Sequence, residues 1–148
     1  MKKIIFLCHG NICRSPVAEA VAKHEVAKAG LADKIEIHSA ALSSDEIGHT
    51  PDPRSLATLK SVGLDGLVKT HRARQVQASE LSDFDLFVVM DSNNVRQFRS
   101  IFGTTEKMIK LLDDKDVDDP YYTLEFDRTL NEIQAGVANL IQSLKANL

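Results

Sequence analysis

The stretch KIIFLCHGNICRSP, residues 3–16, joins an apolar run to a polar turn and then to the start of a helix. Its apolar part, residues 4–7, has the continuous pattern of a strand buried on both faces of a parallel sheet. Ser15 suits the N-cap of a helix, and Pro16 suits the first helical position, where its missing N–H is no loss. The stretch therefore predicts a strand, a tight loop and a helix, with Cys8 at the carboxyl end of the strand.

The predicted loop combines residues that suit the binding of an anion. Arg14 follows Cys8 by six positions, and Gly10 and Asn11 are residue types that tolerate left-handed backbone. Such a loop can direct several backbone N–H groups, a helix N-terminus and a guanidinium at one tetrahedral anion, with a thiolate beneath it. We therefore predict a site at which the sulfur of Cys8 attacks phosphorus.

The rest of the chain alternates between short apolar runs and amphipathic stretches. The predicted strands are residues 3–7, 35–38 (an edge strand), 84–90 and 107–112. The predicted helices run from the loop to Gly30, from Asp52-Pro53 to Val62, over residues 95–102 and over residues 126–144. This alternation predicts an α/β fold: a doubly wound, flavodoxin-like, four-stranded parallel sheet with helices on both faces, in one domain spanning residues 1–148. Ligands of such sheets bind at the carboxyl ends of central strands, where Cys8 would lie.

Composition narrows the class of protein. A chain of 148 residues with 43% hydrophobic content is long enough for one domain with a substantial core. Its net charge of −3 argues against a partner that is a nucleic acid or a membrane surface. No stretch is apolar for long enough to span a bilayer, and the apolar run after Lys2 and Lys3 is too short for a signal peptide. We expect a cytoplasmic protein whose two cysteines stay reduced.

Two motifs carry a resemblance to a known family. CHGNICRSP, residues 8–16, resembles the phosphate loop of the low-molecular-weight protein tyrosine phosphatases, and Asp119-Pro120-Tyr121-Tyr122 is similar to their general-acid loop. Weaker matches lie between them in the family's order, at Ser39-Ala40, Asp52-Pro53-Arg54, His71, residues 73–76 and Met90-Asp91. The resemblance thus covers essentially the whole chain, residues 1–148.

The resemblance implies a role for each of three residues. Cys8 would be the nucleophile that forms a cysteinyl phosphate, and it would react as a thiolate stabilised by loop amides and Arg14. Arg14 would hold two equatorial phosphoryl oxygens and bind the transition state more strongly. Asp119 would protonate the leaving phenolate and later accept a proton from water. No metal and no cofactor is implied, because the loop does what a cation would do.

Other positions carry supporting roles by the same resemblance. The phosphate-binding loop would comprise His9, Gly10, Asn11, Ile12, Cys13 and Ser15. Ser39 and His71 would join Asn11 and Ser15 in a hydrogen-bond network that holds the loop, although His71 could equally be a core histidine. Asp45, Tyr121 and Tyr122 would line the substrate cleft, where the tyrosines stack on a phenyl ring and are themselves candidates for phosphorylation. The alternative for the tyrosines is one packing and one surface aromatic.

Three of these positions carry specific expectations. Cys13 would form a disulfide with Cys8 under oxidant, the alternative being a small buried residue. His9 stands where relatives carry an aliphatic residue, so that it either adds anion affinity when protonated or faces solvent. Asp45 stands where many relatives carry a cleft aromatic, which puts their style of peptide recognition in doubt and disfavours acidic substrates.

Rival functions and sites can be separated by sequence. Arsenate reductases share this loop but use two further cysteines, which this chain lacks. Phosphoarginine phosphatases carry threonine where Ile12 stands, and a non-catalytic phosphotyrosine-binding module would not need both Cys8 and Asp119. We therefore expect phosphotyrosine proteins as partners and a monomer or weak dimer.

Three other groups of side chains could be interpreted as a calcium, a zinc or a nucleic-acid site, but each interpretation is weak. A calcium-loop pattern over Asp114, Asp116, Asp118 and Glu125 has Asp119 where glycine is required. A zinc site built from Cys8, His9 and Cys13 has no fourth ligand at a suitable spacing. The basic residues Lys69, Arg72 and Arg74 beside His71 form a solvated face rather than a nucleic-acid site. We expect no metal.

Overall fold

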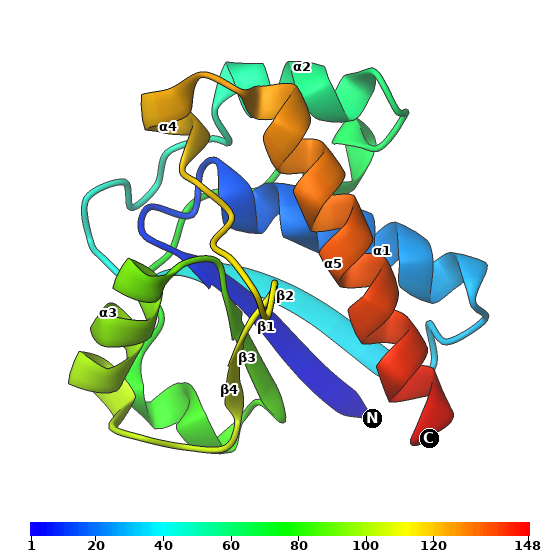
Figure 1. Ribbon diagram of the computed structural model, residues 1–148, viewed down its shortest axis with the longest axis vertical. Coiled ribbons are helices and arrows are strands. Elements are labelled where there is room, and N and C mark those ends of the chain that lie inside the picture. The colour runs from blue at the N-terminus through cyan, green and yellow to red at the C-terminus, as the bar shows by residue number, and fades with distance from the viewer.

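Strand β1 (Lys2–Cys8) lies inside a four-stranded parallel sheet, as the computed structural model of residues 1–148 shows (Figure 1). The strand order is β2-β1-β3-β4, where β2 is Ile35–Ala41, β3 is Leu86–Val89 and β4 is Met108–Lys110. All three strand pairs are parallel, and β2 is an edge strand, as predicted. The predicted α/β fold class is thereby confirmed, although β3 and β4 are shorter than the apolar runs that predicted them.

Helices cover both faces of the sheet. The helices α1 (Arg14–Lys28), α2 (Pro53–Lys60) and α5 (Phe126–Ala146) lie over one face, and α3 (Ser92–Phe102) lies over the other (Figure 1). Three short helical turns complete the chain: η1 (Asp65–Val68), η2 (Ala78–Ser82) and α4 (Pro120–Thr123). Only the four long helices were predicted.

Side chains of β1 alternate between two separate cores, because successive residues of a strand point to opposite faces. Ile4 and Phe6 belong to a cluster of 23 buried residues beneath α1 and α5. Ile5 and Leu7 belong to a cluster of 9 buried residues beneath α3. The smaller cluster contains Phe87 and Phe98, whose rings pack edge to face with centroids 5.3 Å apart. Burial on both faces explains why the sequence of β1 is continuously apolar.

Helix α2 begins where Asp52-Pro53 predicted and ends earlier than expected. The Asp52 side chain accepts a hydrogen bond from the Arg54 backbone N–H at 2.8 Å, which makes it the N-cap. The helix ends at Lys60, so the prediction that Val62 belongs to its apolar stripe is wrong. Val62 is instead 44% exposed, beside the left-handed turn at Gly63.

The segment from β4 to Asp119 is held by close packing against α5. A Cβ atom added at Gly136 of α5 would lie 2.8 Å from Cγ of Leu111 and 2.9 Å from Cδ2 of Leu112. Only glycine therefore lets the helix approach this segment so closely. Because β4 leads into the segment that carries Asp119, this contact also places one side of the candidate site.

We expect Gly136→Ala to destabilise the domain. Overpacking a filled core costs about 1–3 kcal/mol, and the better helix propensity of alanine offsets about 1 kcal/mol of that, which leaves a net loss of roughly 1 kcal/mol. Urea unfolding followed by circular dichroism measures the change. Gly66→Ala is a matched control, since a Cβ atom there meets nothing within 4 Å. A gain in stability for Gly136→Ala would contradict the packing argument.

Candidate active site

The loop between β1 and α1 curls around the sulfur of Cys8. Asn11 adopts left-handed backbone with φ of 60°, and its N–H donates to Cys8 Sγ at 3.3 Å. Gly10 does not use positive φ, which corrects the reason given for it from sequence. It is instead a point of close approach, because a Cβ atom there would lie 3.1 Å from Cγ of Glu46.

The start of α1 differs from the prediction. The helix begins at Arg14, and Cys13 occupies the N-cap position without a side-chain cap hydrogen bond. The predictions that Ser15 is the N-cap and that Pro16 is the first helical residue are therefore wrong, since Pro16 is the third residue of the helix. The hydroxyl of Ser15 lies inside the first turn and contacts Cys8 Sγ at 3.1 Å, so it serves the loop instead of the helix end.

A chain of hydrogen bonds runs from a buried carboxylate to the sulfur of Cys8. Ser39 Oγ donates to Glu19 Oε1 at 2.5 Å, which leaves the serine oxygen to accept from Asn11 Nδ2 at 3.0 Å. The same Asn11 amide donates to Ser15 Oγ at 2.8 Å. Since a carboxylate only accepts and the amide nitrogen only donates, the hydroxyl proton of Ser15 is left to point at Cys8. The network thus favours a hydrogen bond to a thiolate.

Further contacts hold the loop from the side of residues 71–74. His71 Nε2 donates to the Asn11 carbonyl oxygen at 3.3 Å. The backbone N–H of Arg74 donates to Asn11 Oδ1 at 3.3 Å. The structure therefore brings Asn11, Ser15, Ser39 and His71 together, as the sequence suggested. Asn11 is completely buried, so the strained left-handed residue is held on all sides.

Arg14 is a buried cation that spans the floor of the site. Its side chain is 3% exposed, and its Nη1 donates to Asp91 Oδ2 at 2.6 Å and to the Val117 carbonyl oxygen at 2.8 Å. Burial by itself would lower the pKa of Arg14, but the charges of Cys8 and Asp91 outweigh burial and raise it. Nε and Nη2 make no hydrogen bond within the protein, so they remain for a bidentate contact with an anion.

Asp119 approaches the same site from the segment after β4. Its Oδ2 lies 3.6 Å from Nη2 of Arg14, and its Oδ1 accepts from the Tyr121 backbone N–H at 3.0 Å as the N-cap of α4. The two tyrosine rings contact each other edge to face with centroids 5.2 Å apart. Tyr121 is 58% exposed and Tyr122 is 80% exposed, so neither is a core residue. The capped turn thus places the Asp119 carboxyl group beside Arg14 and leaves both tyrosine rings largely exposed to solvent.

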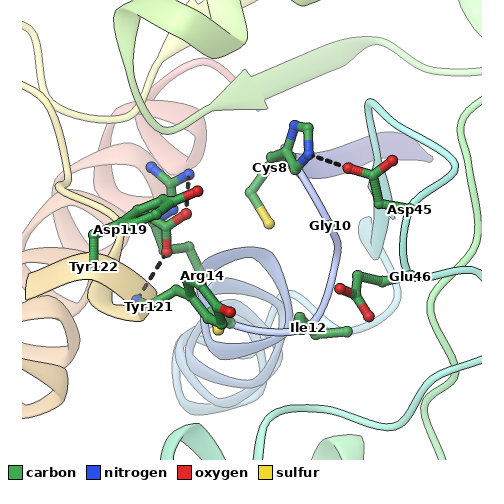
Figure 2. A pocket seen from close by; sticks show the side chains of 11 residues that line it. Cys8, Gly10, Ile12, Arg14, Asp45, Glu46, Asp119, Tyr121 and Tyr122 are labelled. Atoms are coloured by element: carbon green, nitrogen blue, oxygen red, sulfur yellow. Dashed lines mark hydrogen bonds and ion pairs between the residues drawn. The ribbon is translucent and has the colours of Figure 1, made fainter. Parts of the chain in front are cut away.

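These groups converge on one open cavity of about 220 Å³, drawn in Figure 2. The sulfur of Cys8 points into it, with Asp119, Tyr121 and Tyr122 on one side and Asp45 and Glu46 on the other. Ile12 and Cys13 also line the cavity. The cavity therefore offers an anion site at its floor, an aromatic wall and an acidic wall.

His9 does not direct its side chain at the anion site. Its Nε2 lies 2.7 Å from Asp45 Oδ2, and its Nδ1 lies 2.8 Å from Nε2 of Gln97 in α3. The ring is 48% exposed, so of the two alternatives raised from sequence the structure agrees with the one in which His9 faces solvent. Its two ring nitrogens are nevertheless engaged by neighbouring side chains.

Cys13 differs chemically from Cys8, although both are free cysteines. Burial and, to a smaller extent, the charges of Asp52, Cys8 and Asp119 raise the pKa of Cys13 to about 12, although the hydrogen bond with Ser55 lowers it. Cys13 therefore stays a neutral thiol near neutral pH, whereas Cys8 has the contacts that suit a thiolate.

Three carboxylates of the site were missed as site residues from sequence. Asp91 caps α3 and holds Arg14, Glu19 ends the network behind Cys8, and Glu46 lines the acidic wall. Asp91 had a usable signal, because it directly follows a buried strand of the sheet that carries Cys8. The only sequence signal for Glu19 was its position one helical turn after Ser15, and Glu46 had no sequence signal. Arg14 lies 77 residues from Asp91 and Ser39 lies 20 residues from Glu19, so only the folded chain brings these pairs together.

Two further features concern the length of the helices and the metal-binding side-chain types. None of the helices combines the length and the apolar character that a membrane span requires. No three side chains of the metal-binding types gather at one place, and Asp116 of the calcium-loop pattern pairs with Lys110 at 2.9 Å. The lysine therefore neutralises a carboxylate that a cation would need.

Known proteins resemble the chain over most of its length. Residues 3–148 match the family model described as low molecular weight phosphotyrosine protein phosphatase. The low molecular weight protein-tyrosine-phosphatase YfkJ of Bacillus subtilis is 37% identical, over 98% of this chain and 97% of that protein. The human low molecular weight phosphotyrosine protein phosphatase is 35% identical, over 82% of this chain and 80% of that protein.

Solved structures agree with this sequence similarity. The crystal structure of YfkJ has a TM-score of 0.93 at 35% identity, and the match covers 99% of this chain and 96% of the other. SP-PTP, the low molecular weight protein tyrosine phosphatase of Streptococcus pyogenes, has a TM-score of 0.87 at 30% identity, with 97% and 93% covered. The family model, the sequence identities and the shared fold show that the chain belongs to the low molecular weight phosphotyrosine protein phosphatases, which are hydrolases.

Proposed function

We propose that the chain hydrolyses phosphotyrosine in proteins, and small aryl phosphates, through a cysteinyl-phosphate intermediate. The observation that carries this proposal is the convergence of Cys8, Arg14 and Asp119 on one cavity with an aromatic wall. A thiolate, a guanidinium and a carboxylic acid in that arrangement supply a nucleophile, an anion clamp and a general acid. Membership of the family supports the same assignment.

The first step transfers the phosphoryl group to sulfur. The thiolate of Cys8 attacks phosphorus, so the S–P bond forms while the bond from phosphorus to the phenolic oxygen breaks. Asp119 gives its proton to that oxygen, and tyrosine leaves as a neutral phenol. Arg14 and the loop N–H groups bind the equatorial oxygens, where charge is spread in the transition state. Since Asp91 already orients the guanidinium, little reorganisation is needed.

The second step returns the enzyme to its starting state. Asp119, now ionised, accepts a proton from a water molecule that attacks the phosphorus of cysteinyl phosphate. The S–P bond breaks, inorganic phosphate leaves, and Cys8 is again a thiolate. The Ser15 hydroxyl, which the Glu19 network points at the sulfur, stabilises the thiolate as the leaving group.

The apolar and aromatic side of the cavity favours the phenyl ring of phosphotyrosine over the guanidinium of phosphoarginine, while the acidic wall lies opposite. Ile12 and Tyr121 both line the cavity, so a flat phenyl ring meets apolar and aromatic surface on its way to Cys8. A guanidinium group in the same place would lose hydration without gaining a polar partner from Ile12.

We expect the wild-type protein to release phosphate at different rates from matched phosphotyrosine and phosphoarginine peptides. Phosphate release in the presence of EDTA should be faster from phosphotyrosine, and Cys8→Ser should abolish turnover while it retains oxyanion binding. Steady-state phosphate release and vanadate or phosphate titration measure the two effects. A preference for phosphoarginine would overturn the substrate assignment, and turnover by Cys8→Ser would overturn the nucleophile.

A second prediction concerns the general acid. Asp119→Asn should slow release of a poor leaving group by about 10²–10⁴-fold, and release of a good one such as p-nitrophenolate far less. Rates for a series of aryl phosphates with different leaving-group acidity measure the effect. Asp118→Asn is the matched control, because Asp118 is an exposed neighbour of the same charge. Equal slowing across the series would exclude Asp119 as the acid.

A third prediction concerns the two cysteines of the loop. Peroxide would convert the Cys8 thiolate to a sulfenic acid, and attack by the Cys13 sulfur would then form a disulfide with loss of water. Because the pKa of Cys13 is about 12, closure should become faster as the pH rises. Recovery of activity with dithiothreitol, normalised to each protein before oxidation, should be lower for Cys13→Ser than for wild type. Equal recovery would contradict a protective disulfide.

A further inference from the structure

A continuous relay of hydrogen bonds connects the end of β3 to the acidic wall of the cavity. Its members, in order, are the backbone N–H of Met90 and the side chains of Asn94, Gln97, His9 and Asp45. We name these five the Met90–Asp45 relay. None of its three middle side chains takes part in the proposed chemistry, so their arrangement calls for a separate explanation.

Each link of the relay has hydrogen-bond geometry. Met90 N lies 3.1 Å from Asn94 Oδ1, and Asn94 Nδ2 lies 3.2 Å from Gln97 Oε1. Gln97 Nε2 lies 2.8 Å from His9 Nδ1, and His9 Nε2 lies 2.7 Å from Asp45 Oδ2. Asn94 is 1% exposed and is also held by its own N–H, which donates to Asp91 Oδ1 at 2.7 Å.

The first member decides the direction of every link. A backbone N–H only donates, so Asn94 must turn its oxygen toward Met90 and its NH₂ group toward Gln97. Gln97 must then accept with its oxygen and donate with its nitrogen, which makes His9 Nδ1 an acceptor. The single ring proton is therefore on Nε2, where it is donated to Asp45. The relay holds His9 as the neutral Nε2–H tautomer.

A neutral His9 leaves the charge of Asp45 uncancelled. The carboxylate is fixed in position by the ring but keeps its full negative charge, and its side chain is 63% exposed at the mouth of the cavity. Glu46, the next residue, is 33% exposed and carries a second carboxylate, in contact with His49 Nδ1 at 2.6 Å. Figure 2 shows both carboxylates on the wall that faces Tyr121 across the cavity.

No lining residue offsets this negative wall. Arg14 is the only lysine or arginine among the residues that line the cavity, and it lies at the floor, already paired with Asp91. A substrate whose phosphate sits on Arg14 therefore places the residues beside its phosphotyrosine near the uncompensated carboxylate of Asp45. A lysine or arginine next to the phosphotyrosine would be attracted by this carboxylate, and an aspartate or glutamate would be repelled. Solvent and salt screen both interactions in part.

We propose that the Met90–Asp45 relay makes Asp45 a specificity-determining residue, which selects phosphotyrosine flanked by lysine or arginine and rejects phosphotyrosine flanked by acidic residues. The inference rests on the proposed function, because it concerns the substrates of the same cavity. His9 and Gln97 act as positioning residues: they orient Asp45 without touching the reacting atoms.

Three phosphotyrosine peptides test the selection. They differ only in the residues on both sides of the phosphotyrosine, which are lysine in the first, glutamine in the second and glutamate in the third. We expect kcat/KM of wild type to be roughly tenfold higher for the lysine peptide than for the glutamate peptide, as attraction and repulsion at an exposed carboxylate each contribute about threefold. The ratio should fall toward unity as salt is raised. In Asp45→Asn the ratio should fall to about threefold or less, because asparagine still accepts from His9 but carries no charge.

Asp33→Asn is the matched control, because it removes the same charge at the opposite end of the sheet, where Asp33 lies beside Met1 and Lys2. It should retain the wild-type ratio. Turnover with equal rates for all three peptides, or an equal fall in ratio for Asp33→Asn, overturns the selection by Asp45 but leaves the proposed function standing. Absence of turnover for every peptide and for p-nitrophenyl phosphate overturns the proposed function itself, and the selection with it.

The tautomer of His9 is tested separately by nitrogen-15 NMR. Long-range proton–nitrogen correlation spectra distinguish a protonated from an unprotonated ring nitrogen, and the signal is assigned by its loss in His9→Asn. We expect an unprotonated Nδ1 and a protonated Nε2 at neutral pH in the wild-type protein. An Nδ1–H tautomer or an imidazolium would overturn the relay.

Discussion

The site depends on one buried ion pair, between the guanidinium of Arg14 and the carboxylate of Asp91. A cation with so little exposure is stable only when its charge and its N–H groups find partners, since desolvation of an unpaired charge costs several kcal/mol. Asp91 and the Val117 carbonyl provide these partners from the ends of β3 and of the segment after β4. The pair therefore ties three loops together at one edge of the sheet. Its remaining donors are what an anion meets in the cavity.

The donor–acceptor direction of the hydrogen bonds is a second constraint on the site, and it is set independently in two networks. Behind Cys8, the carboxylate of Glu19 can only accept, so the hydroxyl of Ser15 is left to donate to sulfur. In front of the cavity, the N–H of Met90 can only donate, so His9 is left to donate to Asp45. In each case a group that can only donate or only accept a hydrogen bond fixes the orientation of neighbouring groups that could do both. Buried polar networks of this kind specify one arrangement because each member is satisfied in only one way.

Sequence reasoning found what local patterns encode. The run of residues 4–7 and the Asp52-Pro53 pair both mark elements whose physical cause lies within a few residues. It failed where the cause lies elsewhere in the fold. Ser15 has the residue type of an N-cap, but the sulfur of Cys8 competes for its hydroxyl. Glu19 binds Ser39, 20 residues away, and Glu46 lies close to Gly10 although 36 residues separate the two, so no pattern in one sequence identifies either as a site residue. The turn α4 was missed because its four residues are too few for periodicity.

The unequal cores on the two faces of the sheet have a consequence for how the molecule loses activity. Only nine buried residues hold the face beneath α3, against twenty-three on the other face. Local opening requires less free energy where less apolar surface is buried, so α3 should exchange its amide protons before α1 or α5 does. Asp91 caps α3 and Gln97 lies within it, so one partial opening would release both the guanidinium of Arg14 and the ring of His9. On warming, the chain should thus become inactive and less selective while most of its sheet is still folded.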